Sequence, residues 1–196
     1  MMRFSVSPLL SLAEAVQQAK QLCPQILAER GSTNPKVMAE RLTAYLLLAG
    51  LMGGSLPKVY WDAHGKPHFA EASVQFNLSH TKTGVAAVIA DHPVGIDLQV
   101  IVPIRNRLSE RVCDASEQFY WMQGKDASEQ KLRFVRLWAA KEAVAKNIGC
   151  GLGKLSPRDI FVDWERRTAT VGERSFRLCC PKIGLPQTVC CIAEEI

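Results

Sequence analysis

The spacing of apolar residues divides the chain into two runs in which helices alternate with short strands. Helical periodicity covers Ser11–Glu29, with Ser11 as the N-cap and Pro24 as a break. It resumes at Asn34, where Asn34-Pro35 opens a helix that runs to about Leu51. Short apolar and β-branched runs then predict strands at Lys58–Trp61, Val74–Asn77, Val85–Ala90 and Val94–Val102.

The second half repeats this arrangement. It predicts helices over Arg105–Arg111, from the capping box at Asp114 through Met122, and over Phe134–Leu152, with a loop at Gly124–Gln130. Four strands follow, at Ile160–Trp164, Thr168–Val171, Phe176–Cys180 and Thr188–Ala193, and the last two form a hairpin. The pattern predicts an α+β protein of two similar lobes, residues 1–92 and 93–196, divided near Asp91-His92-Pro93.

The helix predicted over Phe134–Leu152 carries three charges outside its polar face of Arg133, Arg136 and Asn147. Lys141 lies within an apolar stripe, and Glu142 and Lys146 lie one turn apart beside apolar residues. Buried charges are costly unless they are paired or bind something. On this helix alone, an internal salt-bridge cluster and a site for a charged ligand are equally good readings.

The predicted strand Val94–Val102 is also out of pattern. Side chains alternate along a strand, so Gly95, Asp97 and Gln99 share one face while Val, Ile and Leu line the other. An acidic side chain and an amide in this setting need a partner or a metal. The alternative is a sheet whose second face is wet, which would leave Asp97 without a function.

Composition and charge narrow the class of protein. The chain has 196 residues and a net charge of +5, a mild basic bias that suits an acidic protein partner or a phosphate-rich ligand. No basic cluster interleaved with aromatic residues indicates nucleic-acid binding. No apolar run reaches the length of a membrane span, and the start lacks the apolar core of a signal peptide, so we expect a cytoplasmic protein.

The seven cysteines do not predict a disulfide framework, because their number is odd and no secretion signal is seen. The pairs Cys179-Cys180 and Cys190-Cys191 lack the two-residue spacers of common zinc sites. Both pairs lie in apolar, strand-like runs, which favours buried thiols over zinc ligands.

Two carboxylates therefore stand out, Asp97 on a strand and Glu142 on a helix. Magnesium is often held by one or two carboxylates together with substrate phosphates. Lys66 and His80, in loops rich in turn residues, could meet a phosphate, and Lys146 could do the same or hold a carboxylate in place. The residues predict a Mg²⁺-dependent enzyme that acts on a phosphorylated or pyrophosphate ligand.

Three motifs, in this order, resemble the 4′-phosphopantetheinyl transferase superfamily, and in particular its two-lobed, Sfp-type members. They are Phe76-Asn-Leu-Ser-His80, Val94-Gly-Ile-Asp97 and Trp138-Ala-Ala-Lys-Glu-Ala143 with Lys146. The Gly65-Lys66-Pro67 turn and the Gly149–Leu152 run also match. The resemblance implies the pseudo-twofold fold of the family, with an active site in the cleft between the lobes of a monomer.

The resemblance also implies the reaction and the roles of residues. Phosphopantetheine would pass from coenzyme A to a serine of an apo acyl or peptidyl carrier protein, releasing adenosine 3′,5′-bisphosphate. The implied metal ligands are Asp97, Gln99, Glu117 and Glu142, and the implied 3′-phosphate and nucleotide contacts are Lys36, Arg41, Lys66, Ser79 and His80. Lys146 would bind the pyrophosphate and handle a proton, and Glu142 or a metal-bound water would be the base. No role is assigned to Lys141.

Gln99 is a departure, because many Sfp-type enzymes have Asp-x-Glu where this chain has Asp97-Leu-Gln99. The amide oxygen still binds metal, but it brings no negative charge and cannot act as a base. Two alternatives to the transferase therefore stay open: a non-catalytic relative that binds coenzyme A or a carrier protein, and a structural α+β protein with an internal Lys–Glu cluster.

Overall fold

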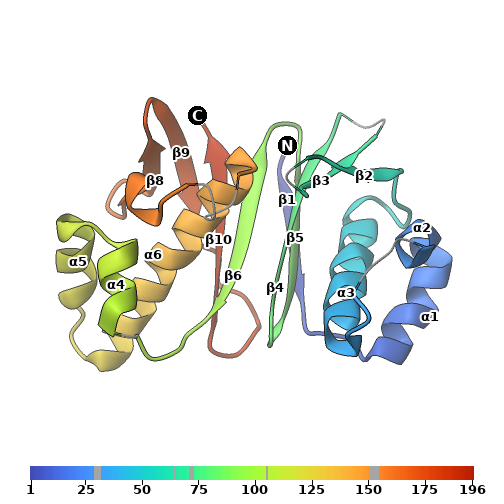
Figure 1. The fold of residues 1–196 in the computed structure, drawn as a ribbon, viewed down its shortest axis with the longest axis horizontal. Helices are drawn as coiled ribbons and strands as arrows, with labels where there is room; N and C mark the ends of the chain where they lie inside the picture. Colours follow the sequence, from blue (N-terminus) through green and yellow to red (C-terminus); the bar gives the residue numbers. More distant parts are fainter. Residues whose placement is uncertain (29–31, 64, 71–72, 105, 151–154) are drawn as a thin grey trace. The chain divides into compact units, whose positions relative to one another are not determined.

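The chain forms two compact units in a computed structural model that describes residues 1–28, 32–63, 65–70, 73–104, 106–150 and 155–196 (Figure 1). Unit 1 consists of Met1–Val94 together with Gly184–Pro186, and unit 2 of Gly95–Ile183 together with Gln187–Ile196. The division falls within the strand that begins at Val94, a few residues beyond the turn at Asp91-His92-Pro93.

The helices of unit 1 begin where local capping residues allow. Helix α1 (Leu12–Leu22) starts with a capping box: the Glu14 N–H donates to Ser11 Oγ, and Glu14 Oε2 accepts from the Ser11 N–H. A five-residue helix, α2 (Pro24–Ala28), follows. Helix α3 (Pro35–Leu51) starts with Asn34, whose side chain accepts a hydrogen bond from the Lys36 N–H.

Unit 1 contains two small antiparallel sheets. The larger has the order β1-β5-β4, formed by β1 (Arg3–Ser7), β5 (Gly84–Ala90) and β4 (Gln75–Thr81). The smaller pairs β2 (Val59–Trp61) with β3 (Pro67–Phe69). Helix α3 packs on β5, and α1 packs on α3, so a single core forms between helices and sheet (Figure 1). Every residue of β5 is buried, as its run of small and β-branched residues predicts.

Unit 2 places its helices before most of its strands. After β6 (Val94–Val100) come α4 (Asn106–Val112), α5 (Ala115–Met122) and the long helix α6 (Ala127–Ile148). Gly149 caps the C-terminal end of α6 and adopts a left-handed conformation with φ of 88°.

The five-stranded sheet of unit 2 has the order β6-β10-β9-β8-β7. Its remaining strands are β7 (Phe161–Asp163), β8 (Thr168–Val171), β9 (Arg174–Cys179) and β10 (Thr188–Glu195), and a 3₁₀ turn, η1, covers Pro157–Asp159. Strand β10 lies beside β6 because the β9–β10 hairpin returns the end of the chain to the middle of the sheet (Figure 1). Helix α6 packs along β10 and forms the core with it.

The α+β fold class is confirmed, as is the β9–β10 hairpin, but several bounds differ from the sequence predictions. Helix α6 begins at Ala127, within the predicted loop, because Asp126 caps it by accepting the N–H groups of Ser128 and Glu129. It ends at Ile148, and residues 151 and 152 of the Gly149–Leu152 run lie outside the described residues. His80, predicted in a loop, is on β4, because the ladder with β5 continues to Thr81.

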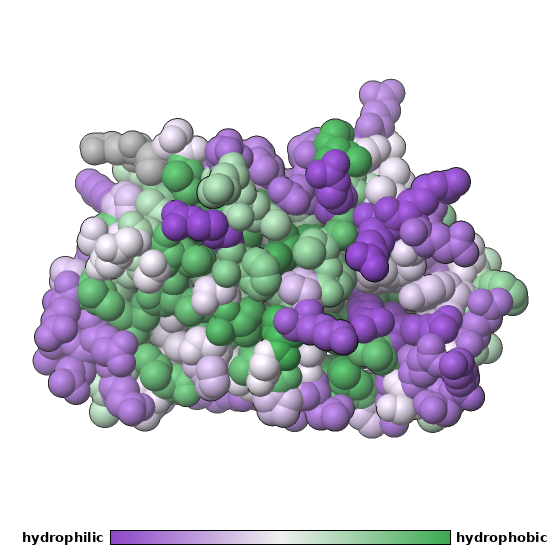
Figure 2. Space-filling view, turned by 180° about the vertical axis from the view of Figure 1, so that it is seen from behind, coloured by the Kyte–Doolittle hydropathy of each residue, from purple (hydrophilic) through white to green (hydrophobic). Residues whose placement is uncertain are grey.

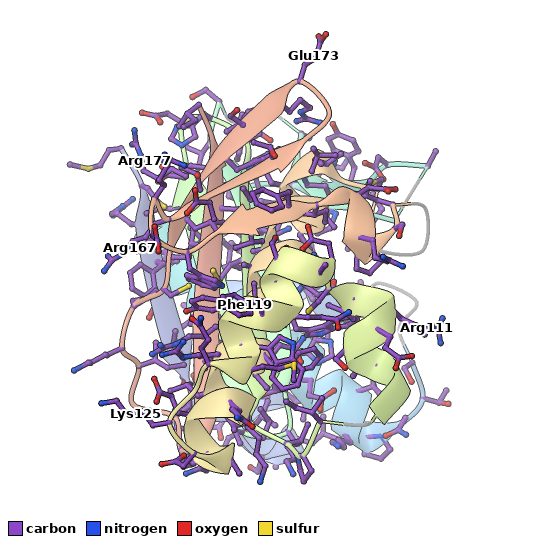
Figure 3. All side chains as sticks on the ribbon, turned by 90° about the vertical axis from the view of Figure 1, so that its left-hand side faces the viewer. Arg111, Phe119, Lys125, Arg167, Glu173 and Arg177 are labelled. Carbon is purple, nitrogen blue, oxygen red and sulfur yellow. The ribbon has the colours of Figure 1, made fainter. Side chains whose placement is uncertain are left out.

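The surface mixes polar and apolar side chains, as the face in Figure 2 shows. The largest exposed apolar side chains of unit 2 include Phe119 and Met122, both on α5, and Figure 3 shows Phe119 on the outer side of that helix. Among the described helices, none combines the length and hydropathy of a membrane span.

Candidate functional site

Gly95 brings strand β6 directly against helix α6. A Cβ atom at this position would collide with the carbonyl oxygen of Ala143 and would lie 2.6 Å from the backbone nitrogen of Asn147. Glycine is therefore required for this close approach. The strand face that carries Gly95, Asp97 and Gln99 is thereby turned toward α6, so the reading of a wet second face is wrong.

Asp97 is the buried centre of the polar contacts between β6 and α6. Its side chain is almost fully buried, Lys146 Nζ lies 2.6 Å from Oδ1, and Gln99 Nε2 donates to Oδ2 over 2.8 Å. A carboxylate buried to this extent needs such partners to remain charged. Lys146 keeps 28% of its side chain exposed, so this residue lies at the edge of the site.

Glu142 lies one turn before Lys146 on α6 and close to Asp97. Burial raises the pKa of Glu142 above its usual value, and the negative charge of Asp97 raises it further, while the charge of Lys146 lowers it. The structure therefore brings together three of the predicted site residues, two carboxylates that repel each other and one ammonium that offsets the repulsion.

The donor set fits a divalent cation that is completed by a ligand. Asp97 and Glu142 offer carboxylate oxygens and Gln99 offers an amide oxygen, all of which are hard donors of the kind that Mg²⁺ prefers. The mutual repulsion of the two carboxylates is a further reason for a cation to bind here. Within the part of the chain that the structure describes, no three His, Cys, Asp or Glu side chains gather as a metal cage. A metal bound here would therefore need ligand phosphates or water to fill its coordination.

The structure places Glu117 in a different cluster from Asp97 and Glu142. Its Oε2 lies 2.6 Å from Lys141 Nζ and also accepts the Asp114 N–H, and its Oε1 accepts the Val162 N–H over 3.0 Å. Because the partners of Glu117 are Lys141 and backbone N–H groups, and not Asp97, Glu142 or Lys146, we do not carry Glu117 forward as a metal ligand. Its capping role, expected from the sequence, is confirmed.

Lys141, to which the sequence assigned no role, is the ion-pair partner of Glu117. Its ammonium is completely buried and donates to Glu117 Oε2 and to the carbonyl oxygens of Val112 and Pro157, at 2.6 to 2.9 Å. All three ammonium protons have acceptors, which is the requirement for a buried lysine charge. Lys141 thus follows the reading of an internal ion pair. Lys146 pairs with Asp97 beside Glu142, and the reading of a charged-ligand site at these residues stays a prediction.

Unit 1 brings together Lys36 and His80 around a buried acid, Glu40. Glu40 lies 3.9 Å from Lys36 Nζ and 3.5 Å from His80 Nδ1, at opposite oxygens of its carboxylate. The two basic side chains are 67% and 59% exposed, so both remain open to an anionic ligand. Sequence reasoning missed Glu40. Its position one turn after Lys36 was the available signal, and its proximity to His80 on β4 was not visible in the sequence.

The other residues of unit 1 that the sequence predicted as nucleotide or 3′-phosphate contacts lie in three different environments. Arg41 donates from Nη2 to the Ile26 carbonyl oxygen over 2.9 Å, so its guanidinium ties α3 to α2 and is not presented with Lys36. Ser79 is buried on β4. Lys66 ends the turn between β2 and β3, where its N–H donates to Asp62 Oδ1 over 2.9 Å, and its side chain is half-buried.

Comparison with known proteins finds the same family that the three sequence motifs resemble. Residues 93–188 match the family model described as the 4′-phosphopantetheinyl transferase superfamily. The 4′-phosphopantetheinyl transferase gsp of Aneurinibacillus migulanus is 37% identical over 91 residues, which cover 46% of this chain and 38% of that protein.

Two further relatives carry the same description. The 4′-phosphopantetheinyl transferase AcpT of Escherichia coli (strain K12) is 33% identical over 130 residues, covering 64% of this chain and 65% of that protein. The 4′-phosphopantetheinyl transferase Sfp of Bacillus subtilis is 32% identical over 99 residues, 50% of this chain and 43% of that protein. The chain thus spans less than two thirds of the length of each relative. The match at residues 93–188 covers β6, α6, Asp97, Glu142 and Lys146, and with these relatives it shows that this part of the chain belongs to the 4′-phosphopantetheinyl transferase superfamily.

Proposed function

We propose that the protein transfers the 4′-phosphopantetheine group of coenzyme A to a serine of an apo acyl or peptidyl carrier protein. The observation that carries the proposal is the gathering of Asp97, Glu142 and Lys146 where β6 meets α6. Two hard carboxylates and one ammonium suit a pyrophosphate with its cation. The family membership of this part of the chain supports the same reaction.

Asp97 and Glu142 would hold Mg²⁺, with the amide oxygen of Gln99 as a further donor. The cation would supply neutralisation of the negative charge on the pyrophosphate oxygens. Lys146 adds a second positive charge at the edge of the site, because its side chain is partly exposed. It would bind the pyrophosphate and stabilise the charge that develops on the leaving phosphate.

The proton of the carrier serine needs an acceptor. In the reaction the serine oxygen forms a bond to the phosphorus that carries pantetheine, the pyrophosphate P–O bond breaks, and adenosine 3′,5′-bisphosphate leaves. Glu142 is the candidate base, since burial and the neighbouring Asp97 raise its pKa and make it a better proton acceptor than an ordinary glutamate. Gln99 cannot take this role, because an amide has no basic site in this range.

The basic residues of unit 1 would serve the nucleotide end of coenzyme A. Lys36 and His80, both exposed around Glu40, would contact the 3′-phosphate, with Lys66 and Ser79 as further contacts. Arg41 would act through the position of α3, because its guanidinium is occupied by the Ile26 carbonyl. The net charge of +5 favours an acidic carrier protein as the second substrate.

The test is to incubate the protein with coenzyme A, MgCl₂ and a panel of apo carrier proteins, and to measure intact carrier mass. We expect one carrier to gain one phosphopantetheine. Glu142→Gln should abolish the gain while the thermal unfolding transition is kept. Glu173→Gln, on a side chain that projects into solvent in Figure 3, should leave the rate unchanged.

A second candidate function is a non-catalytic relative that binds coenzyme A or a carrier protein. The replacement of the second carboxylate of the Asp-x-Glu pattern by Gln99 favours it. Binding of coenzyme A by calorimetry, with no mass gain on any carrier, would establish this alternative and overturn the transferase.

A further inference from the structure

Cys180 and Cys191 place two free thiols side by side in the sheet of unit 2. Their Sγ atoms are 2.7 Å apart. Strands β9 and β10 pair in a register that sets Ile192 opposite Cys179, so Cys180, which follows β9, comes opposite Cys191. Opposite residues of an antiparallel pair have Cβ atoms about 4.5–5.5 Å apart, and a disulfide needs about 3.5–4.5 Å. A small approach of the two strands would therefore suffice for a bond.

The two thiols differ in access. Cys180 lines a cavity of about 270 Å³, while Cys191 is completely buried in the core behind it. Arg136 on α6 and Lys182 after β9 also line this cavity, and both are exposed. A small reagent that carries carboxylates would therefore meet two positive charges on its way to Cys180.

We propose that Cys180 and Cys191 form an oxidation site, at which a low-molecular-weight anionic disulfide such as glutathione disulfide converts the thiol pair into an intramolecular disulfide. These two cysteines have no part in the proposed transfer reaction, and the proposal does not depend on the transferase activity, although the charge of Asp97 contributes to the raised pKa of Cys191.

The chemistry proceeds in two exchanges. The sulfur of Cys180 attacks one sulfur of glutathione disulfide, the reagent's S–S bond breaks, and the first glutathione leaves with the proton of Cys180. The sulfur of Cys191 then attacks Cys180 in the mixed disulfide, and the second glutathione leaves with the proton of Cys191. The protein loses two hydrogens, and one glutathione disulfide is reduced to two glutathiones.

The order of attack follows from burial. Burial raises the pKa of the Cys191 thiol well above its usual value, and no reagent reaches it directly. Cys191 therefore reacts second, through its contact with Cys180. The bond would close the segment 181–190, which includes residues 184–186 of unit 1. Restricting this segment in the unfolded chain should raise the unfolding temperature.

The experiment equilibrates the full chain in glutathione redox buffers, blocks free thiols with iodoacetamide, digests with trypsin and measures peptide masses without reduction. Cleavage after Arg177 and Lys182 gives peptides 178–182 and 183–196, which a disulfide would join. We expect the joined pair, minus two hydrogens, and a higher unfolding temperature that dithiothreitol reverses.

Matched variants assign the bond, since each peptide contains two cysteines. Cys179→Ser and Cys190→Ala should keep the joined peptides, whereas Cys180→Ser and Cys191→Ala should lose them. Cys180 is only partly buried, so the serine variant tests the site even where Cys191→Ala unfolds. Joined peptides in Cys180→Ser, or glutathione that stays on Cys180 without joining, would overturn the proposal.

Discussion

The ammonium of Lys141 lies 2.6 Å from the carboxylate of Glu117, and both side chains are buried within unit 2. The pair joins helix α6 to the first turn of α5, and the further bonds of the ammonium reach Val112 at the end of α4 and Pro157 in η1. Lys141 thus ties three elements to the helix that carries Glu142 and Lys146. Burial raises the pKa of Glu117, and the ion pair with Lys141 opposes that rise.

Removing the ammonium should strongly destabilise unit 2. Lys141→Met would leave Glu117 as a buried charge without its partner, which costs about 3–5 kcal/mol in comparable pairs. Urea unfolding followed by tryptophan fluorescence measures the loss. Arg136→Met, an exposed residue of the same helix, is the matched control and should stay within about 0.5 kcal/mol of the unsubstituted chain. Adding Glu117→Gln to Lys141→Met should recover part of the loss, and the absence of any recovery would argue against a buried carboxylate as its cause.

Gly95→Ala should disturb the site and the fold together. The added methyl would collide with the Ala143 carbonyl oxygen, so β6 must move away from α6, at a cost of about 1–3 kcal/mol or more. Gly50→Ala is the control, because its added methyl meets no atom within 4 Å apart from its chain neighbours and the backbone of its own helix, and alanine favours the helix by roughly 0.5–1 kcal/mol. The unfolding temperatures of the two variants measure this difference. Equal unfolding temperatures for the two would show that β6 is not held this closely.

The elements that the sequence predicted correctly are those governed by local chemistry. Ser11, Asn34 with Pro35, and Asp114 with Glu117 start helices through contacts within one turn, so these residues were enough to predict the starts. The start of α6 was missed because its first turn is polar and resembles a loop. Its signal was Asp126, which caps the helix.

The parts of the site that the sequence could not provide depend on long-range contacts. Lys141 and Glu117 are 24 residues apart, and Lys146 and Asp97 are 49 apart, so no periodicity links them. Asn147 was assigned to the polar face of its helix, yet it is buried and donates to the Ala193 carbonyl on β10. In each case the sheet of unit 2 decides which face of α6 is inside.

The raised pKa of Glu142 can be traced by opposite substitutions at its two charged neighbours. Asp97→Asn removes a negative charge and should lower the pKa of Glu142, whereas Lys146→Met removes a positive charge and should raise it. The ¹³C chemical shift of the Glu142 side-chain carboxyl, titrated in metal-free buffer, measures both. Shifts of the same sign in the two variants would contradict the proposed proximity of the three groups.

The Glu142 carboxyl should also make the free energy of unfolding depend on pH. Because its pKa is higher in the folded than in the unfolded chain, the folded chain binds more protons between these two values. The stabilising contribution of Glu142 is complete below its pKa in the unfolded chain, about 4.3, and it is lost as the pH rises through its pKa in the folded chain. We therefore expect Glu142→Gln to remove part of the decline in unfolding free energy over this window in chelator. An unchanged decline would show that Glu142 does not contribute.

Gln99→Glu tests whether the site is built for a cation. The substitution replaces the hydrogen bond from Nε2 to Asp97 by repulsion between two carboxylates, so the variant should unfold at a lower temperature in chelator. Mg²⁺ relieves this repulsion, so its addition should raise the unfolding temperature more in the variant than in the unsubstituted chain. Gln99→Leu, which offers no oxygen, is the control and should show the smallest response.

Transfer activity of Gln99→Glu at low Mg²⁺ should be kept or raised. An equal response of the Leu and Glu variants to Mg²⁺ would mean that the cation does not contact this position, and a complete loss of transfer would mean that the pocket requires a neutral amide.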